Sequence, residues 1–302
     1  MSAARWSAAG LALAALLMGA CSDDEEKPDA GGDGPVVADA GGDGQVASDS
    51  APPTPDAPAP AACKAGSRGG AKGSTDKLST AGGVLFNVRA PAGYDPTKGH
   101  PLLVVYAAAG GTRDTMEQFT KLTPPATKAG YIIAYVDHVS PVNAGRVTDI
   151  AAVPDQIAKT WCVDRRRVYL TGHSDGGSVI YVMLARKAMP LKPAAIAPSA
   201  AGLSAQALAT VKCLSPAIPA MVIHSKNDGL FKGYGPQARD WWVKCNGCGA
   251  TGKAGADGCL EYPGCTGGAG VQFCETSVGH GTWVAGLNAS ILTFFSRFAR
   301  KQ

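Results

Sequence analysis

The chain has 302 residues and a formal net charge of +4, from 28 Lys and Arg against 24 Asp and Glu. The charge is divided unevenly: residues 22–62 hold ten acids and one lysine, whereas residues 63–302 hold 26 basic and 14 acidic side chains. The basic residues form neither a Lys/Arg run nor a nucleic-acid motif, so we interpret them as a surface property and exclude a nucleic-acid partner.

Residues 1–21 predict an export signal. Arg5 precedes an apolar run from Ala8 to Ala20, which is too short to span a bilayer as a mature helix. The segment LMGAC resembles a bacterial lipobox, in which the cysteine is lipidated and becomes the first mature residue, although Met18 occupies the usual leucine position. We therefore expect a lipid anchor to the membrane at Cys21, with ordinary secretion after cleavage nearby as the alternative.

Residues 22–62 consist mainly of Ala, Gly, Pro and Asp. Such a composition buries too little apolar surface to offset its ordering entropy, so it predicts a flexible tether. The sequence DAGGDG occurs twice, beginning at Asp29 and at Asp39. Its aspartates raise the alternative of a calcium loop, but the ligand pattern of such a loop is incomplete.

Eight of the nine cysteines follow the tether. An even number in an exported chain favours disulfides, up to four, and eight cysteines allow 105 pairings, so no pairing is assigned. Zinc is the alternative, because two of them form the motif CNGC, but no second C-x-x-C or H-x-H partner follows. The candidates are Cys63, Cys162, Cys213, Cys245, Cys248, Cys259, Cys265 and Cys274.

Residues 63–302 predict one α/β domain. Short, continuously apolar runs alternate with helical segments, which is typical of a mostly parallel sheet covered on both faces by helices. The predicted strands are 84–91, 101–107, 131–137, 167–172, 194–200, 219–225 and 271–276. The predicted helices are 113–129, 148–161, 175–189, 234–245 and 286–300.

Ser174 lies in TGHSDGGS, which has the pattern G-x-S-x-G. The preceding RVYLTG predicts a strand, and the apolar residues after Ser174 recur at helical spacing. A strand, a sharp turn and a helix with the serine at the turn form the context of a nucleophile elbow. Gly172 and Gly176 fit this interpretation, because larger side chains would clash in the turn.

A serine nucleophile needs a histidine base and an orienting carboxylate, which in an α/β-hydrolase follow it in the order Ser, acid, His. His280 is the one histidine that can come last, because the others precede Ser174 or, like His224, lie in an apolar run. Asp228 is the favoured acid, because it directly follows the predicted strand 219–225. The other acids after Ser174 that we considered are Asp175, Asp240, Asp257, Glu261 and Glu275.

Acyl transfer also needs backbone donors for the oxyanion. We expect one to be the amide of Asp175, directly after the nucleophile. The second is expected from the loop AAAGG at 107–111, at the amide of Ala108 or Ala109, because this loop follows the strand 101–107. A plain glycine-rich turn is the alternative.

In these residues the chain resembles exported α/β-hydrolases of the polyhydroxybutyrate depolymerase and feruloyl esterase type. The resemblance covers about residues 63–300 and implies a triad of Ser174, Asp228 and His280. It departs from the family at Ala107 and Ala108, where members commonly have His-Gly. The segments that carry it are APAGYDP, CVDRRRVYLTGHSDGG, VIHSKNDGL, WWVKCNGC, EYPGC and GHGTW.

The residues and the resemblance together predict a serine esterase that needs no cofactor or metal and acts as a monomer. Expected substrates are hydroxyalkanoate oligomers, feruloyl or acetyl esters of polysaccharides, or small aryl esters. Trp241, Trp242 and Trp283 are candidates for an aromatic-tolerant pocket, with core packing as the alternative. The competing functions are a surface binding lipoprotein that has lost turnover and a peptidase on the same fold.

Overall fold

The computed structural model describes residues 62–301. The expected export signal, the lipidation site at Cys21 and the DAGGDG repeats lie outside the described residues. The expected tether does too, except for Ala62, which forms an isolated bridge with Lys98. Within residues 62–301, no helix combines the length and the apolar character needed to cross a membrane.

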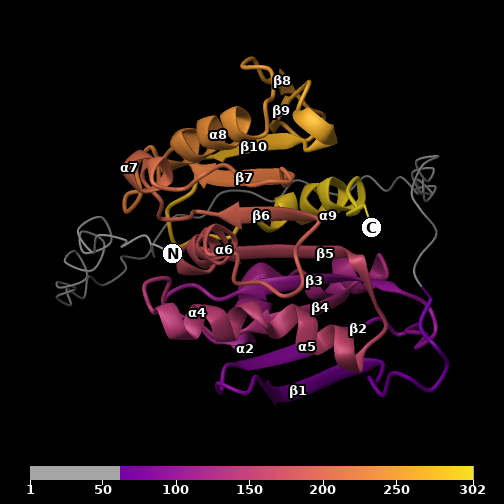
Figure 1. The fold of residues 1–302 in the computed structure, drawn as a ribbon. Helices are drawn as coiled ribbons and strands as arrows, with labels where there is room; N and C mark the ends of the chain where they lie inside the picture. The colour runs from indigo at the N-terminus through magenta and orange to yellow at the C-terminus, as the bar shows by residue number, and fades with distance from the viewer. Residues whose placement is uncertain (1–61, 302) are drawn as a thin grey trace, which may run out of the picture. The chain divides into compact units, whose positions relative to one another are not determined.

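One sheet of ten strands organises the described chain, in the order β1-β2-β4-β3-β5-β6-β7-β10-β9-β8 (Figure 1). Strands β4, β3, β5, β6, β7 and β10 run parallel, whereas β1, β2, β9 and β8 are antiparallel to their neighbours. The strands are Gly73–Ser79 (β1), Leu85–Ala90 (β2), His100–Tyr106 (β3), Ile132–Val136 (β4), Val163–His173 (β5), Ala195–Ser199 (β6), Ala220–Ser225 (β7), Lys253–Ala254 (β8), Leu260–Tyr262 (β9) and Val271–Thr276 (β10).

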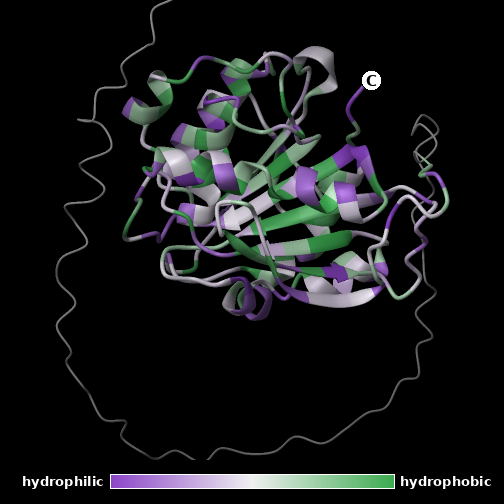
Figure 2. Cartoon of the chain, turned by 60° about the horizontal axis from the view of Figure 1, so that its bottom comes forward, coloured by the Kyte–Doolittle hydropathy of each residue, from purple (hydrophilic) through white to green (hydrophobic). Residues whose placement is uncertain are grey.

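Helices cover both faces of the sheet. Side chains of α4, α5, α6 and α8 pack in one apolar cluster, and those of α2, α3 and α9 pack in the cluster on the opposite face. Figure 2 shows the hydrophobic colouring concentrated on the central strands between these layers. The helices are Arg113–Thr120 (α2), Thr123–Lys128 (α3), Ala144–Ala151 (α4), Val153–Thr160 (α5), Asp175–Ala185 (α6), Ala205–Ala209 (α7), Tyr234–Cys245 (α8) and Asn288–Ser296 (α9), with short 3-10 turns at Thr266–Gly268 and Ala285–Leu287.

The prediction of a mostly parallel sheet with helices on both faces is confirmed. The seven predicted strands correspond to β2, β3, β4, β5, β6, β7 and β10. Strands β1, β8 and β9 and helix α7 were not predicted. They are short or largely exposed, so they lack the continuous apolar runs on which the strand predictions rested.

Two segments that we predicted as single helices each form parts of two helices in the structure. The segment 113–129 divides into α2 and α3, because Lys121 adopts a left-handed conformation and two prolines occupy the first turn of α3. The segment 148–161 belongs to α4 and α5, which meet at Ala152, two residues before Pro154. The proline lacks an amide hydrogen, so it is accommodated at the start of a helix but not in its interior.

All eight cysteines after the tether form disulfides, as predicted. The bridges join Cys63 with Cys162, Cys213 with Cys245, Cys248 with Cys265, and Cys259 with Cys274. The two cysteines of CNGC, Cys245 and Cys248, therefore each bond to a different cysteine outside the motif. The zinc interpretation is wrong for these residues, because every sulfur is already part of an S–S bond.

Candidate active site

Ser174 lies at a sharp turn between a buried strand and a buried helix. Strand β5 ends at His173 and helix α6 begins at Asp175 (Figure 1). Ser174 itself has φ 54° and ψ −117°, a region that residues with a side chain rarely occupy. Such strain persists only where the surrounding structure enforces it, and it is the conformation expected of a nucleophile elbow.

Two glycines make this turn possible. A Cβ at Gly176 would lie 2.1 Å from the carbonyl oxygen of Tyr106, at the end of β3. A Cβ at Gly172 would lie 2.6 Å from the backbone of Gly176. The glycines therefore allow the first turn of α6 to contact the backbone where β3 ends, and this contact brings the AAAGG loop beside Ser174.

The structure brings Ser174, His280 and Asp228 into one line of hydrogen bonds. His280 Nδ1 lies 2.7 Å from Asp228 Oδ2, and His280 Nε2 lies 2.9 Å from Ser174 Oγ. A carboxylate only accepts, so Nδ1–H donates to Asp228 and Nε2 is left to accept from the serine hydroxyl. A hydroxyl, an imidazole and a carboxylate connected in this way can activate the serine as a nucleophile.

Asp228 is the acid that contacts His280, and it lies in the loop that follows strand β7. It is 1% exposed, and its Oδ1 accepts from the backbone amides of Leu230 and Phe231 at 2.9 and 2.7 Å. Burial opposes the ionised form, but the hydrogen bonds from His280 and the Phe231 amide prevail and lower the pKa of Asp228. The carboxylate is therefore held ionised where it can orient the imidazole.

The loops that carry the acid and the base are bound to each other. The Ser225 hydroxyl, at the end of β7, donates to the carbonyl of Val278, and the Asn227 side chain donates to the carbonyl of Ser277 at 2.6 Å. Strands β7 and β10 lie side by side in parallel, so both loops leave the same edge of the sheet. This connection fixes the His280 loop relative to Asp228.

His173, the first variable residue of the G-x-S-x-G pattern, donates a hydrogen bond to the backbone of His280. It is 3% exposed, and its Nε2–H donates to the carbonyl of His280 at 2.7 Å. Its Nδ1 lies 3.2 Å from the Ser199 hydroxyl, which can donate to it. Burial lowers the pKa of His173 to about 4, so the ring is neutral at pH 7 and suited to this donor and acceptor arrangement.

The structure places the three expected oxyanion residues on two neighbouring segments. Asp175 is the first residue of α6, so its amide has no acceptor within the helix. In the AAAGG loop, the amide of Ala107 donates to Val136 and that of Gly111 donates to Ala108. Within residues 62–301, the amides of Ala108 and Ala109 donate to no protein acceptor, so they remain available to a ligand.

Two of the three candidate tryptophans pack in the apolar core. Trp242 and Trp283 are buried, and their indole N–H groups donate to Tyr181 and Asn288. Trp241 is half-buried and packs edge-on against Trp242. The aromatic side chain beside the site is Phe231, whose ring meets His280 edge-on at 5.0 Å. Sequence reasoning missed Phe231, because nothing in its spacing distinguishes it from a loop residue.

Among the described residues, no group of three or more His, Cys, Asp or Glu side chains is placed to hold a metal ion. Two of the other acids considered for the triad lie elsewhere: Asp240 is exposed on α8 beside Arg239, and Asp257 accepts from Gln272.

Comparison with known proteins gives similarities to esterases. No protein-family model matches the chain. Feruloyl esterase B of Piromyces equi is 28% identical over 225 residues, which are 64% of this chain and 41% of that protein. The chain therefore spans well under two thirds of the length of this relative.

Solved structures share the fold at low sequence identity. An acetyl xylan esterase from Aspergillus awamori superposes with a TM-score of 0.56 at 13% identity, over 75% of this chain and 99% of that one. A feruloyl esterase module from Clostridium thermocellum, complexed with sinapinate, gives 0.54 at 14% identity, over 82% and 93%. Fold and sequence agree: the chain has the α/β-hydrolase fold and is similar in sequence to a feruloyl esterase.

Proposed function

We propose that the chain is a serine esterase that hydrolyses carboxylic esters through an acyl-enzyme at Ser174. The observation that carries this proposal is the line of hydrogen bonds from Ser174 through His280 to the buried Asp228. The positive φ of Ser174 supports it, because the strained turn presents the hydroxyl at the start of a helix.

In the proposed reaction, Ser174 Oγ attacks the ester carbonyl while His280 Nε2 accepts the hydroxyl proton. The oxyanion that forms accepts hydrogen bonds from the amides of Asp175 and of Ala108 or Ala109. His280 then gives its proton to the leaving alcohol. A water molecule, deprotonated by His280, attacks the acyl-enzyme and releases the acid. Asp228 keeps Nδ1 protonated and stabilises the imidazolium.

The proposed substrates are feruloyl or acetyl esters of polysaccharides, hydroxyalkanoate oligomers and small aryl esters, some of them polymeric. The similarity to a feruloyl esterase supports the first group. Phe231, which packs against His280 and stacks on Tyr234, provides an apolar wall beside the reacting atoms.

The test is hydrolysis of p-nitrophenyl acetate and butyrate by the wild type and by Ser174→Ala, followed by feruloyl, acetyl and hydroxybutyrate esters. We expect Ser174→Ala to lower kcat by roughly 10⁴-fold or more, because the nucleophile is lost. Equal turnover by wild type and variant would refute the proposal. A fluorophosphonate probe separates the competing function, since a folded protein whose Ser174 does not react would be a binding protein without turnover.

We also propose that the chain is exported, anchored by a lipid on Cys21 and monomeric. The four disulfides support export, because such bonds persist in oxidising compartments. Metabolic labelling with a palmitate analogue tests the anchor: we expect labelled wild type in the membrane fraction and an unlabelled Cys21→Ser variant. Equal labelling of both proteins would exclude lipidation at this residue.

A further inference from the structure

His138, which follows β4, contacts both segments that carry the expected oxyanion donors, and Asp137 before it contacts the start of α2, just beyond one of them. One segment is the AAAGG loop, residues 107–111, and the other is the start of α6 at Asp175. Neither segment is adjacent in sequence to Asp137 and His138. The parallel pairing of β3 with both β4 and β5 brings the ends of all three strands to one edge of the sheet.

His138 contacts each segment with a different group. Its backbone amide donates to the carbonyl of Gly111 at 3.2 Å, at the end of the AAAGG loop. Its ring Nε2 lies 2.9 Å from Asp175 Oδ2. The carboxylate only accepts, so Nε2 carries the proton and donates it. One residue therefore connects the loop after β3 to the first residue of α6.

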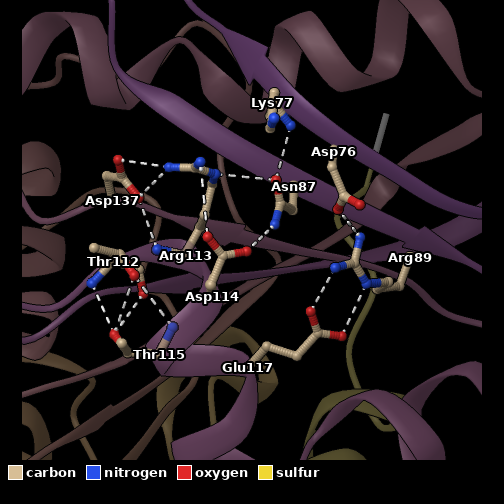
Figure 3. Close-up of polar contacts among 10 residues, drawn as sticks. All are labelled: Asp76, Lys77, Asn87, Arg89, Thr112, Arg113, Asp114, Thr115, Glu117 and Asp137. Atoms are coloured by element: carbon tan, nitrogen blue, oxygen red, sulfur yellow. Dashed lines mark hydrogen bonds and ion pairs between the residues drawn. The ribbon is translucent and has the colours of Figure 1, made fainter.

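Asp137 anchors the chain just beyond the same end of the loop, at Arg113, the first residue of α2. Its carboxylate accepts from the backbone amide of Arg113 at 2.7 Å and from the Arg113 guanidinium at 3.0 and 3.1 Å (Figure 3). The guanidinium also donates to Asn87. Thr112 caps α2 by a reciprocal exchange with Thr115. The AAAGG loop therefore leads into a helix whose first residues are held in place. The backbone that can still move lies between Ala107 and Gly111.

The contact between His138 and Asp175 also fixes the position of the negatively charged Asp175 side chain. The Asp175 carboxylate belongs to the residue whose amide is expected to stabilise the oxyanion, so rotation of this side chain can move its negative charge toward the developing one. Like charges repel, so such a rotation would raise the energy of the transition state. A donor that holds the carboxylate in one position keeps it from turning toward the oxyanion or the Ser174 hydroxyl.

We propose that His138 is a positioning residue that sets the spacing of the two oxyanion donors and restrains the Asp175 carboxylate. The inference rests on the proposed esterase function. His138 acts through Asp175 and Gly111 and takes no proton from the substrate. Its loss should therefore weaken binding of the transition state and leave binding of the ground state almost unchanged.

The experiment compares His138→Ala, His138→Gln and Asp175→Ala with the wild type on p-nitrophenyl acetate. We expect His138→Ala to lower kcat by roughly 10- to 100-fold with KM within about twofold, because a small displacement of aligned donors has this effect. His138→Gln should recover much of the rate, since its amide N–H reaches a position close to Nε2. The double variant with Asp175→Ala should be no slower than the slower single variant, since both substitutions break one contact.

A transition-state analogue separates positioning from general structural damage. Inhibition by phenylboronic acid, which forms a tetrahedral adduct on a serine, should weaken in His138→Ala by about the same factor as kcat. The matched control is His100→Ala, because His100 is also half-buried with two hydrogen bonds but lies at the start of β3, the opposite end of the strand. We expect His100→Ala to retain the wild-type kcat.

The outcomes distinguish this inference from the proposed function. A wild type without esterase activity would refute the proposed esterase function itself. An active wild type with an unchanged kcat in His138→Ala, or a loss shared equally by His100→Ala, would overturn the positioning role. If His138→Ala does not fold, Asp175→Ala tests the spacing of the donors, since a kcat equal to that of the wild type would exclude the spacing role of the contact.

Discussion

At the residue scale, three histidines in related positions have different environments. His280 faces Ser174 and Asp228, whereas His173 and His224 are buried and lie behind it. His224 Nε2 donates to the carbonyl of Phe231 at 3.0 Å and lies 3.4 Å from Asp228 Oδ2. Burial lowers the pKa of both His173 and His224. Both rings are therefore neutral at pH 7 and hold the loops around the site rather than exchange protons.

The burial of His173 predicts a pH-dependent stability. Its pKa is about 4 in the folded chain and about 6.5 when exposed, so the unfolded state binds a proton first as the pH falls. The contribution of His173 to the free energy of unfolding has its full value above about pH 6.5. It falls by on the order of 3 kcal/mol as the pH approaches about 4. Urea unfolding at several pH values measures this slope in the wild type and in His173→Gln.

His173→Gln should flatten the dependence, because its amide does not titrate and can still donate to the His280 carbonyl. A smaller slope remains, since the pKa of His224 is also lowered. The lowered pKa of Asp228 acts at more acidic pH, below the window of His173. Identical slopes in wild type and variant would show that His173 is not the titrating group.

At the element scale, the turn between β5 and α6 depends on a close approach of backbones. The first turn of α6 contacts the end of β3, where Gly176 leaves no room for a Cβ beside the Tyr106 carbonyl. This contact joins the nucleophile to the strand that precedes the AAAGG loop. Glycine at this position is therefore a packing requirement, since Gly176 lies in the helix and does not need a positive φ.

Gly176→Ala should lower the free energy of unfolding by roughly 2–4 kcal/mol, because the new methyl group overlaps backbone atoms that cannot rotate away. Esterase activity should fall with it, as the turn carries Ser174. The matched control is Gly93→Ala, where a Cβ meets nothing within 4 Å, and its change should stay within about 0.5 kcal/mol. Equal effects of both substitutions would contradict the steric explanation.

The central elements were predictable from local sequence because each carries a strong pattern of hydrophobicity. Strands such as β3 and β4 are continuously apolar, since both of their faces are covered. Helix breaks were less predictable. The division between α2 and α3 depends on a left-handed Lys121, a residue without the usual preference for that conformation.

At the scale of the whole molecule, the disulfides join distant parts of the chain to the sheet. The bridge between Cys63 and Cys162 closes a loop of 99 residues and ties the start of the described chain to the residue before β5. The other three lie in the C-terminal part, and two of them, Cys248–Cys265 and Cys259–Cys274, hold the β9–β10 extension. The edge strands β8 and β9 have few buried residues, so covalent bonds replace an apolar core there.

The length of the loop that each disulfide closes predicts how much it contributes to the free energy of unfolding. By chain entropy alone, removing Cys63–Cys162 costs about 4.7 kcal/mol, whereas removing Cys259–Cys274, which closes 15 residues, costs about 3 kcal/mol. Denaturant unfolding of the two double Cys→Ser variants measures the difference. A greater loss from the short loop would show that contacts within the native extension, rather than loop entropy, determine its stability.

The sequence by itself determined the fold class, the strand that ends at the serine, the one eligible histidine and the acid that follows β7. These are local patterns of hydrophobicity and chain order, and each is readable along a single segment. The disulfide pairing, the contact of His173 with the His280 carbonyl and the link from His138 to Asp175 were decided by the tertiary structure. They join residues 15 to 107 positions apart or depend on which strand ends are neighbours. No local pattern encodes that proximity, because it arises only when the parallel sheet brings the ends of its strands together.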